Sequence, residues 1–83
     1  MANGNRQQFS IPLNHFHWLT YEQAAVYTGF SVRYLRNLVS ADQIPVYGNL
    51  RSRRFRRDML DLFLTDHDVA MRKFRLERNS HGN

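Results

Sequence analysis

Residues 20–40 read TYEQAAVYTGFSVRYLRNLVS, and they contain the start and stop signals of two short helices in succession. Thr20 is a good N-cap, and Gln23 follows three positions later, which is the spacing of a capping box. Gly29 is typical of the position at which a helix ends. We therefore predict a first helix that begins after Thr20 and stops at Gly29.

A second helix follows almost at once, over residues 32–40, with Ser31 as its N-cap. Its apolar side chains recur at the helical spacing i, i+3, i+4: Leu35, Leu38 and Val39. The opposite face carries Arg33, Tyr34, Arg36 and Asn37. Two short helices joined by a tight turn that contains glycine make a helix-turn-helix.

Residues 51–58 read RSRRFRRD, five arginines that surround one phenylalanine. A purely solvated basic tail has no use for Phe55. Residues 46–47 read as a short strand, a turn signal begins at Gly48, and residues 54–56 read as the return strand. The pattern predicts a β-hairpin wing with a loop of about four to six residues, in which Phe55 points inward and its arginine neighbours point outward because strand side chains alternate.

From Asp58 onward, a stripe of side chains recurs at a spacing of three to four: Leu60, Phe63, Leu64, His67, Met71 and Phe74. It predicts either one long helix that reaches about Leu76 or two helices with a break near residues 65–66. Met71 and Phe74 are assigned either to the core or, since a small domain cannot bury every apolar side chain, to a surface that meets a partner.

These elements predict a single domain over residues 9–76, of the α+β class and mainly α, built as a winged helix-turn-helix with a two-stranded β-hairpin wing and a C-terminal helix. Residues 1–8 read as a disordered lead-in, and residues 77–83 as a frayed tail. Before the first helix, a short strand is possible, and three side chains are expected to cover the core: Phe16, Trp18 and Leu19.

The charge of the chain narrows the class of partner. The 83 residues carry a net charge of +5 with a pI near 10.5, and every basic residue except Lys73 is arginine. Arginine presents a planar fork of donors that suits phosphates and guanine edges. Nucleic acid is therefore the leading partner, ahead of an acidic protein or an anionic membrane surface.

Other function classes find little support in the sequence. The absence of cysteine excludes disulfides and thiolate metal sites and favours a cytoplasmic protein. No apolar run reaches the roughly 20 residues that span a membrane. His15 and His17 are too few to hold a metal, and no nucleophile–base pair or glycine-rich phosphate loop stands out. We expect no enzymatic activity, no metal and no cofactor.

The segment of residues 18–64 resembles the winged helix-turn-helix of phage excisionases and MerR-type regulators. The matching stretches are LTYEQAAVYTGFSVRYLRNLV, QIPVY and RRFRRDMLDLFL. The small size, with no effector domain attached, favours an excisionase, which is a recombination directionality factor, over a small MerR-like transcriptional regulator. The resemblance implies a protein of the bacterial host cell that binds double-stranded DNA beside a phage attachment site, bends it in several self-associating copies, and helps a tyrosine integrase to excise the prophage.

In a helix-turn-helix the second helix enters the major groove. Arg33 and Arg36 are then expected to bind guanine or phosphate, Asn37 to pair with adenine, and Tyr34 to contact a phosphate or a thymine methyl. The wing residues expected to reach a minor groove or clasp phosphates are Asn49, Arg51, Ser52, Arg53 and Arg54.

Two further points remain open in the sequence. Arg56 and Arg57 begin the last helix, where the helix dipole disfavours cations, so they predict an external anion such as phosphate. The competing interpretation comes from another functional class: a protein–protein adaptor whose basic face binds an acidic partner. An arginine-rich wing beside the second helix favours DNA over such a protein partner.

Overall fold

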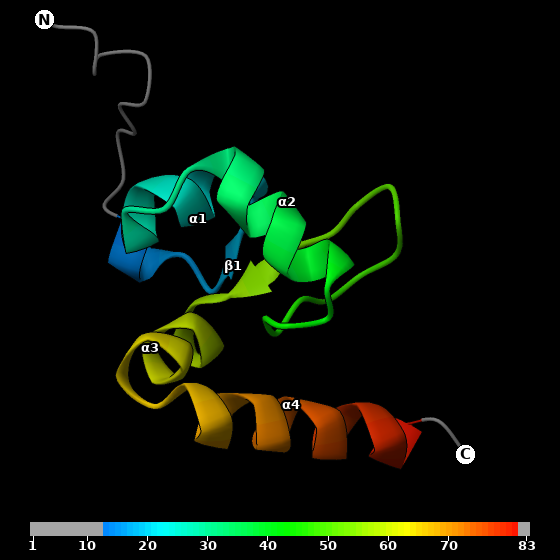
Figure 1. Ribbon diagram of the computed structural model, residues 1–83. Coiled ribbons are helices and arrows are strands. Elements are labelled where there is room, and N and C mark those ends of the chain that lie inside the picture. The colour runs from blue at the N-terminus through cyan, green and yellow to red at the C-terminus, as the bar shows by residue number, and fades with distance from the viewer. Residues whose placement is uncertain (1–12, 82–83) are drawn as a thin grey trace, which may run out of the picture.

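The computed structural model describes residues 13–81 (Figure 1). Its elements, in chain order, are the 3-10 helix η2 (Leu13–His15), β1 (Trp18–Leu19), α1 (Tyr21–Thr28), α2 (Val32–Ser40), β2 (Phe55–Arg56), α3 (Arg57–Thr65) and α4 (His67–His81). The predicted lead-in of residues 1–8 lies outside the described residues. None of the described helices combines the length and the apolar character that a membrane crossing requires.

The predicted caps of the helix-turn-helix are confirmed. The Thr20 hydroxyl accepts a hydrogen bond from the Gln23 amide at 3.1 Å, and the Gln23 side chain accepts one from the Thr20 amide at 2.9 Å, which completes the capping box. Gly29 ends α1 with φ of +86°, in the left-handed region that glycine enters without a Cβ clash. The Ser31 hydroxyl accepts from the Tyr34 amide at 3.0 Å and starts α2.

The strand pairing differs from the predicted hairpin. β1 and β2 form the two-stranded antiparallel sheet, with Leu19 opposite Phe55. On the other edge of β2, the wing closes through a single bridge, in which Tyr47 and Arg54 exchange two backbone hydrogen bonds of 2.8 Å. The return strand therefore pairs mainly with the segment before α1. This places Phe55, which is fully buried as predicted, at the centre of the core.

The C-terminal region divides into two helices, which confirms the alternative with a break near residues 65–66. The backbone of Asp66 leaves the helical conformation at φ −152° and ψ 88°, and its carboxylate accepts from the Val69 amide at 3.3 Å at the start of α4. The prediction of a frayed tail after Leu76 is wrong for the described part, because α4 continues to His81. Glu77 and Arg78 hold these last turns through contacts with distant segments of the chain, described below.

The core lies between the helix-turn-helix, the small sheet and the two C-terminal helices. It consists of buried side chains from every layer: Leu19, Ala24, Leu35, Ile44, Phe55, Met59, Leu60, Phe63, Ala70, Met71 and Phe74. Met71 and Phe74 are only 3% and 4% exposed, so their assignment to a partner surface is wrong. The break after α3 turns α4 back across the domain (Figure 1), so that Met71 and Phe74 belong to the core.

The N-terminal expectations hold in part. Leu19 is fully buried and Phe16 packs against the core, but Trp18 is 44% exposed. In the two-residue strand β1 these neighbours face opposite sides of the sheet. The indole of Trp18 instead lies edge-on to Tyr47, with ring centroids 5.5 Å apart.

Candidate nucleic-acid interface

α2 presents four predicted site residues on its surface. Arg33, Tyr34, Arg36 and Asn37 are all exposed, while Leu35 between them is fully buried. The Arg36 guanidinium lies over the Tyr21 ring, 4.5 Å from its centroid. The Tyr34 ring meets Phe30 edge-on at 5.0 Å. Two of the four side chains are thus held in defined orientations, which lowers the entropy lost when they meet a ligand.

The wing loop, residues 48–53, is organised by Asn49. Its side-chain oxygen accepts hydrogen bonds from the Arg51 amide at 2.9 Å and from the Ser52 amide and hydroxyl, both at 3.0 Å. Arg51 and Arg54 are exposed, and Arg53 is partly buried. The local contacts of Asn49 and Ser52 therefore shape the loop, while Arg51 and Arg53 supply its charge.

Gly48 makes the entry to this loop possible. Its φ of +92° lies in the left-handed region, and a Cβ at this position would collide with the backbone oxygen of Ser52. Only glycine meets both requirements without strain. The sequence signal for a turn at Gly48 is thus explained by a close approach of two backbone segments.

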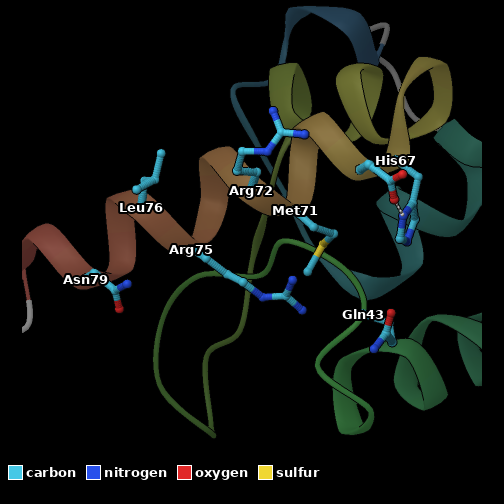
Figure 2. A pocket seen from close by; sticks show the side chains of 8 residues that line it. Gln43, His67, Met71, Arg72, Arg75, Leu76 and Asn79 are labelled. Atoms are coloured by element: carbon cyan, nitrogen blue, oxygen red, sulfur yellow. Dashed lines mark hydrogen bonds and ion pairs between the residues drawn. The ribbon is translucent and has the colours of Figure 1, made fainter.

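α2 and the wing loop lie on the same side of α4, as both views of the molecule show (Figures 1 and 2). The wing loop rises beside the C-terminal end of α2, and α4 crosses the domain beneath them in Figure 1. The two elements that carry the predicted DNA-binding residues are therefore neighbours on one side of α4.

The base of the wing is fastened to α4 by a polar cluster. The Tyr47 hydroxyl donates a 3.0 Å hydrogen bond to the Glu77 carboxylate, and the Arg56 guanidinium binds the same carboxylate at 3.3 Å while lying over the Tyr47 ring. Burial, followed by the hydrogen bond to Glu77, raises the pKa of Tyr47 well above its ordinary value. Tyr47 is thus a neutral donor at neutral pH.

A second connection joins α4 to the turn that follows α2. Both terminal nitrogens of Arg78 bind the Asp42 carboxylate, at 3.1 and 3.4 Å, and Arg75 donates to the Asp42 backbone oxygen at 3.2 Å. Asp42 has φ of +58°, a conformation that Asp adopts more readily than most side chains. The hydrogen bond from Arg78 holds the pKa of Asp42 below its ordinary value.

Figure 2 shows Arg75 pointing from α4 toward the segment that contains Gln43, whereas Arg72 points away from it. An open groove of about 570 Å³ lies between α4 and the segment that contains Gln43, and its lining is partly polar and partly apolar. Among residues 13–81 no group of three or more His, Cys, Asp or Glu side chains is placed to hold a metal ion.

The expectation of an external anion at Arg56 and Arg57 is not upheld, because both have partners within the chain. Arg56 binds Asp58 at 2.8 Å as well as Glu77, and Arg57 donates to the Phe16 backbone oxygen at 3.0 Å. These acceptors offset the unfavourable helix dipole.

Sequence reasoning did not find the α4 contacts. Asp42 is followed by Gln43 and a buried Ile44, a pattern that indicates a turn. The pattern does not reveal which residues bind the Asp42 side chain. The arginines that bind Asp42 lie more than 30 residues away, near or within the segment read as a tail. The three-residue spacing of Arg75 and Arg78 fits one face of a helix that continues beyond Leu76.

The helix-turn-helix, the wing and the basic surface define the class of protein. Residues 18–68 match the family model described as "Helix-turn-helix domain", which extends from β1 to the first turn of α4. The chain belongs to this helix-turn-helix domain family. No curated protein and no solved structure shows a match. A helix-turn-helix domain indicates DNA binding and is typically non-enzymatic.

Proposed function

We propose that the protein binds double-stranded DNA at specific sites, with α2 in the major groove and the wing loop over the adjacent minor groove or its phosphates. One observation carries this proposal: α2, with its exposed polar side chains, and the arginine-bearing wing loop lie on the same side of α4 (Figures 1 and 2). Arg33, Arg36 and Asn37 are side chains of the types that read guanine and adenine edges.

The finer role that we propose is that of an architectural excision factor. It would bind in several copies beside a phage attachment site, bend the DNA and assist a tyrosine integrase. The resemblance of residues 18–64 to excisionases supports this role. A small transcriptional regulator is the competing role within the same class, and it uses the same DNA-binding surface.

A footprint on the DNA around its own gene and around the attachment site of its genome, at a stated salt concentration, tests both levels of the proposal. Protected repeats beside the attachment core support the excision role, whereas protection confined to a promoter supports the regulator. About six phosphate contacts give a log–log salt dependence with a slope of roughly −5. A protein that protects no DNA at low salt contradicts DNA binding altogether.

Point variants identify the surface that binds. Arg36→Ala removes a guanidinium from α2, and Arg72→Ala is the matched control, because Arg72 is an exposed arginine on α4 that points away from the segment following α2 (Figure 2). We expect about 10- to 100-fold weaker binding for Arg36→Ala and a much smaller loss for Arg72→Ala. Equal losses would show that the protein binds DNA only through its overall charge.

A further inference from the structure

The most exposed large apolar side chain among the described residues is at the tip of the wing loop. Leu50 is 80% exposed, compared with 62% for Leu76 and 46% for Leu64. An isolated surface leucine is ordinary in itself. Leu50 differs because of its place: Asn49 precedes it, Arg51 follows it, and the loop that carries it rises beside the C-terminal end of α2 (Figure 1).

The loop holds Leu50 outward by its own contacts. The Asn49 side chain binds the amides of Arg51 and Ser52, and Gly48 brings the start of the loop against the Ser52 backbone. These bonds close a compact turn on both sides of Leu50. An apolar side chain therefore projects from a turn in which two arginines, Arg51 and Arg53, follow it.

We propose that Leu50 inserts into the minor groove of the bound DNA and wedges against a base step. This inference rests on the proposed DNA-binding function. The walls of a minor groove are sugars, which offer apolar surface, and apolar wedges partly unstack base steps and bend the duplex toward the major groove. Arg51 and Arg53, which follow Leu50 in the loop, would bind the phosphates along the groove, so the basic loop and its apolar tip fit one ligand.

The charge around the tip favours DNA over a second copy of the chain as the occupant. Arg51 and Arg53 lie in the same loop, Arg54 directly follows it, and the whole chain is basic, with a net charge of +5. Two such loops or two such chains repel each other. A flexible pyrimidine–purine step under the wing is the sequence that costs least to unstack.

The test measures affinity and bending together, on a duplex that carries one binding site and a dye at each end. Leu50→Ala is expected to bind about tenfold more weakly and to reduce the change in energy transfer that reports bending, because most of the buried apolar surface is lost. Leu50→Met keeps the size and apolar character and should retain both. Leu64→Ala is the matched control, since Leu64 is an exposed leucine on α3, away from the wing loop.

The outcomes separate this inference from the function on which it rests. If Leu50→Ala binds and bends like the wild type while Arg36→Ala binds weakly, the wedge is refuted and DNA binding stands. If Leu50→Ala changes only the cooperativity between adjacent sites, the tip contacts a second copy and the wedge is again refuted. If the wild-type protein binds no DNA, both proposals fail. Unchanged thermal unfolding of Leu50→Ala, expected for so exposed a side chain, excludes misfolding as the cause.

Discussion

The contact between Tyr47 and Glu77 should be measurable as a coupling free energy. Tyr47→Phe removes only the hydroxyl, and Glu77→Ala removes the carboxylate while keeping a strong helix former in α4. A hydrogen bond to a charged acceptor contributes about 1.5–3 kcal/mol when it is buried. Tyr47 is partly buried and the Glu77 side chain is 33% exposed, so solvent screening reduces the expected coupling to about 1 kcal/mol.

Urea unfolding of the wild type, the two single variants and the double variant, followed by circular dichroism at neutral pH, gives this coupling. We expect the two single losses to sum to about 1 kcal/mol more than the loss in the double variant. A coupling below about 0.3 kcal/mol, which is the usual error of additivity, would refute the view that Glu77 anchors the wing.

The Glu77→Ala variant gives a sharper test, through its effect on DNA binding. Removing an acidic side chain from a protein that binds DNA normally strengthens binding, because electrostatic repulsion of the phosphates falls. Glu77→Ala should instead weaken it, since the wing base loses its attachment to α4. Asp68→Ala is the control, because Asp68 is an exposed acid in the first turn of the same helix. If both variants bind more tightly, the anchor does not matter for the interface.

Three further predictions concern single positions. Gly48→Ala should lower the free energy of unfolding by about 1–3 kcal/mol, measured in urea, because alanine at φ +92° is strained and its Cβ meets the Ser52 backbone. Arg36→Ala should retain the unfolding midpoint of the wild type within a few degrees, so that its weaker DNA binding reports a lost contact. The ion pair of Asp42 should stabilise the fold at pH values above the unfolded pKa of about 3.9, and this stabilisation should disappear as the pH falls through the lower pKa of the folded state. In Arg78→Ala, the pKa of Asp42 measured by NMR titration should rise toward the unfolded value.

Local signals account for what the sequence predicted correctly. The caps at Thr20 and Ser31 and the stop at Gly29 depend on contacts within three or four residues, which a linear sequence displays. The exposed face of α2 follows from the same short period. These features hold in the structure because nothing in the tertiary contacts opposes them.

Distant contacts account for what it did not predict. Arg56 has one partner nearby in sequence, Asp58, but its second partner, Glu77, is 21 residues away, beyond a helix break whose existence was itself undecided. The spacing of Met71 and Phe74 is the same whether they belong to the core or to a partner surface. They are buried because the chain changes direction at Asp66 and α4 packs back against the domain. Pairing of β2 with residues 18–19 depends on chain topology in the same way.

α4 connects these observations, because it contacts both ends of the segment that joins α2 to the wing. Asp42 at the start of this segment binds Arg75 and Arg78, and Tyr47 at its end binds Glu77. All three α4 residues lie beyond residue 68, where the match to the helix-turn-helix family model ends. A wedge can bend DNA only if the loop that carries it resists being pushed back, since unstacking a base step costs a few kcal/mol. In the proposed complex the contacts with α4 would supply that resistance, so the part of α4 beyond the family match would set the angle between α2 and the wing loop and hence the shape of the bound DNA.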